Sequence, residues 1–186
     1  MNKELVKLHI GAGTDIKEGW VNHDVAELPG IDVVHDLGVY PWPWEDNSID
    51  EIYMKDVLEH LPKTIKVMEE IYRVCKPGAK IFIAVPYWNS YEAITDPTHV
   101  SQFNEFTFEF FNPTNSRCQT RPYYTNARFE IRKIGFGVSF LRPYIQIKFI
   151  SHYFIVFNPI GKWFIGLFAS LFNNIITGLE VYLEKK

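Results

Sequence analysis

The sequence predicts a single α/β domain with a mostly parallel sheet, and three observations carry this prediction. An apolar, branched run at residues 5–10 stops at Gly11-Ala12-Gly13, which is typical of a buried strand that ends in a tight turn. Further apolar runs alternate with helical or loop segments through the first half of the chain, an order typical of parallel strands joined by right-handed crossovers. The length of 186 residues suits one domain with a substantial core.

The first half is expected to contain short strands and one clear helix. The strands are expected at residues 5–10, 20–24, 31–36, 49–54 and 79–85. A helix is predicted to open at Pro62, with apolar side chains at helical spacing on one side, and Lys76-Pro77-Gly78 is expected to end it. The link from Gly13 to Trp20 is too short for a full crossover helix.

The second half is less regular. Residues 87–97 and 112–126 are predicted to be loops, whereas residues 101–111 are predicted to be a helix because their phenylalanines share one side. Alternating or apolar runs predict strands at residues 129–134, 145–149 and 179–183.

Residues 159–175 are predicted to form an amphipathic helix inserted before the last strand. Its apolar stripe is unusually bulky and consists of Ile160, Trp163, Phe164, Leu167, Phe168, Leu171, Phe172 and Ile175. Asn158, Lys162 and Asn173 interrupt the roughly 20 apolar residues that a bilayer-spanning helix requires. Two interpretations stay open: the helix lies in the membrane interface, or it packs on its own sheet or on a partner subunit.

Composition excludes some classes of function. The chain has 19 basic and 22 acidic residues, so no electrostatic surface for nucleic acid is expected. Cys75 and Cys118 lack a metal-type spacing, and reduced thiols are the simpler expectation. The first residues lack the apolar core of a signal peptide, so we expect a cytoplasmic protein, with peripheral attachment to the inner face of the membrane if the 159–175 helix binds lipid.

Several motifs follow one another along residues 5–111. They are His9-Ile10-Gly11-Ala12-Gly13, Gly19-Trp20-Val21-Asn22-His23-Asp24, Asp36-Leu37, Asp46-Asn47-Ser48-Ile49-Asp50-Glu51-Ile52, Val57-Leu58-Glu59-His60-Leu61 and Lys76-Pro77-Gly78-Ala79. In this order and spacing they resemble the class I S-adenosylmethionine-dependent methyltransferases. Asp96-Pro97-Thr98-His99 with Phe103-Asn104-Glu105 resembles the small, methyltransferase-11-like bacterial enzymes found among those of polysaccharide biosynthesis.

The resemblance implies a Rossmann-like sheet of seven strands, the last of them antiparallel, with S-adenosylmethionine across the carboxyl ends of the first strands. One domain, 1–186, then divides into a cofactor-binding core at 1–111 and a substrate-side part at 112–186. The implied cofactor contacts are His9, Gly11, Ala12, Gly13, Asp24, Val25, Asp36, Leu37, Asp56 and Val57. Asp24 is the implied ligand of the ribose hydroxyls, and a carboxylate suits that role because it accepts two hydrogen bonds at once.

The reaction implied is methyl transfer to a small or glycan acceptor, with an oxygen of a sugar or lipid-linked saccharide as the expected target. His99 is the first candidate for the base that removes the hydroxyl proton, because an imidazole titrates near neutral pH. Asp96 and Glu105 are candidates to orient His99 or to bind sugar hydroxyls. A hydrogen bond that merely orders the loop is the competing interpretation of His99, and no metal site is predicted.

Two features depart from the family pattern. Asp15 stands where a third glycine is usual, and the first crossover is short. These departures leave open a degenerate chain that binds S-adenosylmethionine without turnover. The aromatic 159–175 helix leaves open a second alternative to an active enzyme, a membrane-attached interaction module.

Overall fold

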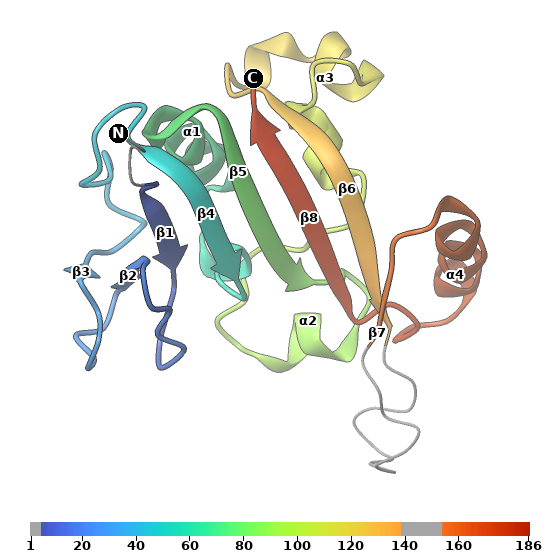
Figure 1. Cartoon of the computed structure of the whole chain (residues 1–186). Coiled ribbons are helices and arrows are strands. Elements are labelled where there is room, and N and C mark those ends of the chain that lie inside the picture. Colours follow the sequence, from blue (N-terminus) through green and yellow to red (C-terminus); the bar gives the residue numbers. More distant parts are fainter. Residues whose placement is uncertain (1–4, 139–153) are drawn as a thin grey trace.

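The computed structural model describes residues 5–138 and 154–186, and it contains an eight-stranded mixed sheet (Figure 1). The strands are β1 (Lys7–Ile10), β2 (Val21–Asp24), β3 (Val33–Val34), β4 (Ile49–Lys55), β5 (Cys75–Pro86), β6 (Phe129–Val138), β7 (Phe154–Val156) and β8 (Gly178–Lys185). They lie in the order β3-β2-β1-β4-β5-β8-β6-β7. The strand expected at residues 145–149 lies outside the described residues.

The sheet combines a parallel part with an antiparallel part. β3, β2, β1, β4 and β5 are parallel, as the alternating pattern predicts. β8 runs antiparallel between β5 and β6, so the last strand has the expected direction. The expected number of seven strands is wrong, because the short β7 pairs antiparallel with β6 and adds an eighth strand at the edge.

The connections near β2 explain why the first elements are short. No helix occurs between β1 and β2 among these described residues, in agreement with the short link. β3 is only two residues long, although residues 31–36 were expected to be extended. The reason lies in Asp32, whose carboxylate accepts the backbone N–H of Asn22 at 2.8 Å and so takes a donor that a longer strand would use.

Helix α1 (Thr64–Val74) lies behind one face of the sheet (Figure 1). It begins two residues after Pro62 and ends where Lys76-Pro77-Gly78 predicts, although β5 begins at once, at Cys75. The buried side chains of α1 and of the 3-10 helix η2 (Thr107–Phe111) form one core with buried residues of β1, β4, β5 and β8. This burial of an apolar helix face is the main stabilising contribution to the fold.

The opposite face of the sheet presents a row of half-buried aromatic rings. Tyr53 and Phe82 stack with ring centroids 4.8 Å apart, and Phe82 lies 4.9 Å from Tyr182. Among the described residues, Figure 1 shows no helix in front of this face of β4, β5 and β8. The sheet in the described part of the chain is therefore covered by helices on one side.

The segment after β5 differs from the sequence prediction. The expected helix at residues 101–111 is wrong: Phe103 forms a parallel bridge with Tyr87, and only Thr107–Phe111 is helical, as η2. Asn104 starts that turn, because its side chain accepts the N–H of Phe106 at 3.0 Å. Two expected loops also contain short helices, namely α2 (Tyr91–Thr95), α3 (Ser116–Thr120) and η3 (Pro122–Tyr124).

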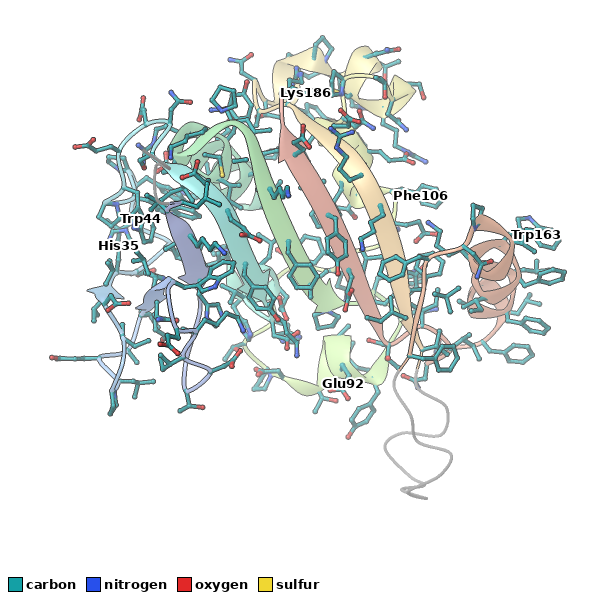
Figure 2. The ribbon with its side chains drawn as sticks, in the orientation of Figure 1. His35, Trp44, Glu92, Phe106, Trp163 and Lys186 are labelled. Carbon is teal, nitrogen blue, oxygen red and sulfur yellow. The ribbon has the colours of Figure 1, made fainter. Side chains whose placement is uncertain are left out.

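A helix, α4 (Pro159–Leu171), lies between β7 and β8, and its first turn is capped by the Asn158 side chain, which accepts the N–H of Gly161. One side of α4 faces the protein: Ala169 is buried, and the Lys162 ammonium donates to the Ile134 carbonyl at 3.0 Å. The bulky stripe is exposed instead, by 49–72 %, at Ile160, Trp163, Phe164, Leu167, Phe168 and Leu171, and Figure 2 shows Trp163 pointing away from the sheet. The bulky stripe therefore does not pack on its own sheet, and no described helix is long and apolar enough to span a membrane.

Gly11→Ala is predicted to destabilise the fold far more than Gly13→Ala. Both residues have a positive φ, which costs alanine about 1–2 kcal/mol. A Cβ at Gly11 would also lie 2.1 Å from Val57 Cγ2, and such overlap adds about 1–3 kcal/mol, whereas a Cβ at Gly13 meets nothing within 4 Å. Urea denaturation of both variants measures the difference. Adding Val57→Ala to Gly11→Ala should recover part of the loss, and strict additivity of the two changes would contradict the contact.

Candidate active site

The loops after β1 and β4 meet at the carboxyl edge of the sheet. β4 ends at Lys55, and Asp56 then adopts a left-handed φ of 54°, with its N–H donating to the Ala84 carbonyl of β5 at 3.0 Å. This conformation is costly for a residue other than glycine, so the surrounding contacts must fix the turn. It carries Val57 onto Gly11, where only the absent side chain of glycine leaves room.

The glycine turn is tied to the end of β2. The Gly13 N–H donates to Asp24 Oδ2 at 2.8 Å, and the Ala26 N–H donates to Asp24 Oδ1 at 3.0 Å. The Ala12 N–H donates to the carbonyl of His23 at 2.9 Å. The structure thus brings together Gly11-Ala12-Gly13, Asp24 and Val57, which the resemblance places at the cofactor.

The other residues implied at the cofactor have different surroundings. The Asp36 carboxylate accepts the N–H of Gly38 at 2.8 Å, and Leu37 is buried in the core. Val25 is exposed. His9 is buried, its Nδ1 lies 3.4 Å from Asn22 Oδ1, and burial holds the pKa of its imidazole below the ordinary value.

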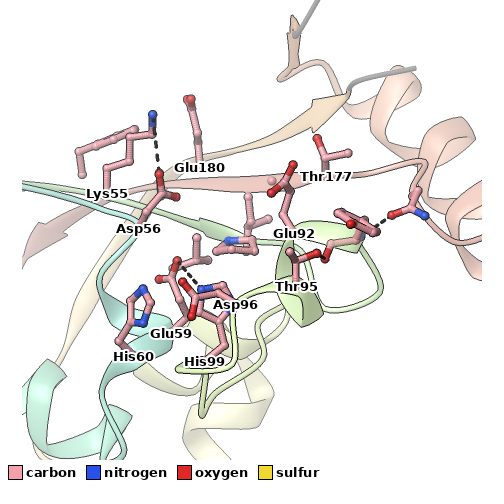
Figure 3. Close-up of a pocket in the computed structure, with 18 of the residues that line it drawn as sticks. Lys55, Asp56, Glu59, His60, Glu92, Thr95, Asp96, His99, Thr177 and Glu180 are labelled. Carbon is pink, nitrogen blue, oxygen red and sulfur yellow. Dashed lines mark hydrogen bonds and ion pairs between the residues drawn. The ribbon is translucent and has the colours of Figure 1, made fainter. Parts of the chain in front are cut away.

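A pocket of about 640 Å³ opens on the far side of the Asp56 turn (Figure 3). β4, β5 and the start of β8 form its walls, together with η1 (Leu58–His60), α2 and the loop that follows α2. Its charged and imidazole groups are Lys55, Asp56, Glu59, His60, Glu92, Asp96, His99 and Glu180. The lining thus contains five carboxyl groups and one lysine, which favours a cation or a donor of several hydrogen bonds.

Glu59 is the most unusual group of this pocket. It is 1 % exposed, and neither oxygen of its carboxyl group has a hydrogen-bond partner within the described structure. Its pKa is raised to about 7, mainly by burial, with a contribution from the Asp56 and Asp96 carboxylates and against the opposing effects of its own backbone N–H and of His99. Such a perturbed, buried group in a pocket is typical of functional sites.

The two histidines beside Glu59 are held through their Nδ1 atoms. His99 Nδ1 lies 3.2 Å from the Ala93 carbonyl, and its Nε2 lies 3.9 Å from Glu59 Oε1. His60 Nδ1 lies 2.8 Å from the hydroxyl of Thr98, which itself donates to Asp96 Oδ1 at 2.6 Å. Because a carbonyl and an already donating hydroxyl can only accept, both imidazoles are assigned a proton on Nδ1 and a free lone pair on Nε2.

The candidate catalytic residues are only partly brought together. His99 and Asp96 line the pocket, but Glu105 does not, because its carboxylate accepts the hydroxyl of the buried Tyr87 at 2.8 Å. Glu59 and His60 entered the sequence prediction only as part of the motif at residues 57–61, and neither was given a role in the site. A charged residue inside the apolar run Val57–Leu61 was the available signal for Glu59.

The comparisons with known proteins agree with this geometry. Residues 11–83 match the family model described as a methyltransferase domain. A 63-residue stretch is 36 % identical to phosphoethanolamine N-methyltransferase 2 of Caenorhabditis elegans. The stretch makes up 33 % of this chain and 14 % of that protein. A 75-residue stretch is 33 % identical to a probable S-adenosylmethionine-dependent methyltransferase of Mycolicibacterium smegmatis. This stretch makes up 40 % of this chain and 28 % of that protein. The matched stretches thus cover less than a third of these curated relatives.

Solved structures show the same fold. The chain is similar to a SAM dependent methyltransferase from Archaeoglobus fulgidus, with a TM-score of 0.61 at 19 % identity over 97 % of this chain and 86 % of that one. It is also similar to a possible histamine N-methyltransferase from Thermotoga maritima, with a TM-score of 0.62 at 12 % identity over 100 % of this chain and 84 % of that one. The chain has the Rossmann-like methyltransferase fold, and the matches support a class I methyltransferase that uses S-adenosyl-L-methionine.

The buried carboxyl group generates a prediction about stability and pH. Folded Glu59 releases its proton near pH 7, whereas an unfolded glutamate does so near 4.5, so the unfolded chain binds fewer protons between these values. The free energy of unfolding should therefore decrease as the pH rises from 4.5 to 7, by up to about 3 kcal/mol. Glu59→Gln should remove this decrease.

Urea denaturation at pH 5 and pH 8, in the presence of a chelator, measures the effect. The difference between wild type and Glu59→Gln isolates Glu59 from Asp56, Asp96 and His99, which face it. Glu92→Gln, at an exposed wall of the same pocket, serves as the matched control. Parallel pH profiles of wild type and Glu59→Gln would contradict the assignment.

Proposed function

We propose that this protein transfers the methyl group of S-adenosylmethionine to a hydroxyl group of a sugar or of a lipid-linked saccharide. The observation that carries the proposal is the shared Asp56–Val57 turn. Its Val57 side packs on the glycine turn implied for the methionine part of the cofactor, and its Asp56 side lines the pocket that contains His99. A donor and an acceptor on the two sides of this turn would meet at the carboxyl edge of the sheet.

The protein's task in such a transfer is mainly alignment. The sulfonium leaves as a neutral thioether, so no acid is needed, and the protein has to hold nucleophile, methyl and sulfur in line and exclude water. The acceptor hydroxyl loses its proton to a base. His99 fits that role because it lines the pocket and its Nε2, assigned a free lone pair, lies 3.9 Å from Glu59 Oε1.

The pocket composition supports a sugar acceptor. The rings of Tyr53, Phe82 and Tyr91 offer apolar surface to a sugar ring, and the carboxyl groups accept hydrogen bonds from several hydroxyls. The same excess of carboxyl groups favours a second candidate acceptor, a protonated amine. Incubation with radiolabelled S-adenosylmethionine and separate panels of sugars, lipid-linked sugars and amines discriminates the two.

The exposed stripe of α4 supports a membrane-bound acceptor. Within α4, Lys162 is the charged residue, and it points to the Ile134 carbonyl, so the exposed stripe is uncharged. An apolar stripe of this kind favours a helix that lies in the membrane interface. The chain runs from α4 directly into the pocket wall, where Asn174 and Thr177 line the cavity and Asn174 accepts the N–H of Tyr91. The saccharide of a membrane lipid would thus reach the pocket while its lipid stays in the bilayer.

Asp24 and His99 are predicted to act on different steps. Asp24→Ala should weaken the binding of S-adenosylhomocysteine about tenfold or more, because it removes a charged acceptor worth about 1.5–3 kcal/mol. His99→Gln should leave that affinity unchanged and reduce turnover about 100-fold or more. Calorimetry and the radiolabel assay measure the two effects, with Glu27→Ala, an exposed carboxylate next to the same loop, as control. Tight binding of S-adenosylhomocysteine without transfer to any acceptor would favour the degenerate alternative instead.

A second prediction concerns the membrane. Replacing Phe164, Leu167 and Phe168 by serine should abolish co-sedimentation with anionic vesicles, because each exposed side chain loses about 1.5–3 kcal/mol of apolar transfer energy. Tyr123→Ser, at an aromatic residue that is 78 % exposed on another element, is the matched control and should sediment like wild type. Equal sedimentation of the triple variant and wild type would remove the membrane proposal, and a change in oligomeric state would indicate a partner subunit on this stripe.

A further inference from the structure

We propose that Glu59, His60 and His99 form a binding site for a divalent first-row transition-metal ion, which the sequence alone does not predict. One ligand atom from each of the three residues lies within 4.8 Å of the others (Figure 3). Two imidazoles and one carboxylate are the donor set of catalytic zinc sites, which keep one further position open for water or substrate. Zn²⁺ fits these donors and is the probe in the test below.

The imidazoles are oriented as metal ligands are. Metal-binding histidines usually donate the second ring N–H to a carbonyl or to another fixed acceptor, which exposes the lone pair of the coordinating nitrogen. His99 has this arrangement through the Ala93 carbonyl, and His60 has it through Thr98, which Asp96 in turn holds. The two ring centroids lie 4.7 Å apart, so the two imidazoles are direct neighbours.

Glu59 provides an independent indication of a missing ligand. A carboxyl group that is 1 % exposed and has no hydrogen-bond partner for either oxygen carries an uncompensated desolvation cost. The nearest cationic candidate is His99 Nε2, which at 3.9 Å is beyond hydrogen-bond distance from Glu59 Oε1. A cation placed between the carboxylate and the two imidazoles would compensate Glu59 and use both free lone pairs.

The backbone holds the two ligand segments together. The carbonyl of Glu59 accepts the N–H groups of Val100 at 2.9 Å and Ser101 at 3.1 Å, so the loop with His99 is fixed to η1. Donors on a tetrahedral ion lie roughly 3.4 Å apart, given metal–ligand distances of about 2.1 Å. The ligand atoms lie within 4.8 Å of one another, and Glu59 Oε1 is 3.9 Å from His99 Nε2, so the side chains would have to move closer together when the ion binds.

The pocket also attracts cations. Asp56, Glu92, Asp96 and Glu180 line the same pocket as the cluster, and the one lysine of the lining, Lys55, has its ammonium 3.8 Å from Asp56. A bound cation would face the open side of the pocket. Its role rests on the proposed function, but the ion would replace His99 as the group that activates the acceptor, because His99 would then be a ligand of the ion and no longer a base. The ion would coordinate the acceptor oxygen and lower the pKa of that hydroxyl, so that the proton leaves to water while the oxygen–carbon bond forms and the carbon–sulfur bond breaks.

The test uses untagged full-length protein, because an oligohistidine tag binds zinc itself. After chelation and desalting, calorimetric titration with Zn²⁺ should show one strong site per chain. His60→Ala, His99→Gln and Glu59→Gln should each weaken it at least about 100-fold, since even the loss of a supporting group costs about 10–100-fold. His35→Ala, at a histidine bonded to the Val39 carbonyl outside the pocket, should bind like wild type. When Co²⁺ replaces zinc, wild type and the His35→Ala control should show the visible absorption of a four-coordinate site. The three ligand variants should not show it.

The outcomes separate this inference from the proposed function. Binding of S-adenosylhomocysteine, measured on every variant, verifies that the variant is folded. No zinc binding by wild type, or equal binding by all variants, would overturn the metal site while leaving the methyltransferase proposal intact. A third outcome is that wild type binds one zinc ion, each of the three variants loses it, and wild type binds no S-adenosylhomocysteine. This result would support the metal site and refute the proposed cofactor chemistry.

Discussion

The contact of Gly11 with Val57 is the constraint on which the arrangement of the site depends. Two loops that follow β1 and β4 can touch here only because one of them has no side chain at the point of contact. The same contact fixes where Asp56 points, since its left-handed φ and its hydrogen bond to Ala84 leave the turn little freedom. The glycine turn is therefore as much a packing element as a ligand-binding one, and only Gly13 of the two glycines faces open space.

Glu59 connects this framework to the chemistry of the pocket. Its backbone carbonyl fixes the loop of His99, which stabilises the fold, while its side chain is buried without a hydrogen-bond partner, which destabilises it. A residue with these opposing effects would be replaced by an apolar one if stability alone mattered. The unpartnered carboxyl group of Glu59 lies close to Asp96, His60 and His99. Groups that lower the stability of the fold locally are typical of functional sites.

Much of the fold followed from local patterns. Apolar runs bounded by turn residues predicted β1, β2, β4, β5, β6 and β8, and the short link between β1 and β2 excluded a helix there. The helix expected at residues 101–111 failed because phenylalanines at helical spacing also suit a segment in which Phe103 pairs with Tyr87 and Phe108 enters the core. The stripe of α4 was recognised, but which side of it faces the protein depends on contacts with β6 and β7 that no local pattern contains.

The site was predictable where a residue's role depends on the backbone, and less so where it depends on distant neighbours. The glycine turn, Asp24 and His99 were proposed from position and motif, and their roles stay predictions. Glu105 does not line the pocket, because its carboxylate accepts the hydroxyl of Tyr87. Glu59 was overlooked, because the burial of its carboxyl group arises from η1 and the loop with Val100 together.

The position of β8 determines when the sheet can form during synthesis. β8 is the last strand along the chain, yet it lies between β5 and β6 and is the neighbour through which β6 and β7 join the parallel strands. A ribosome therefore releases β1 to β5 as a partial sheet whose β5 edge stays unpaired until residues 178–185 emerge. Closure is a late, non-local step that spans about a hundred residues of sequence, and such pairing is intrinsically slow. The wall of the pocket that β8 provides is then the last part of the site to be built.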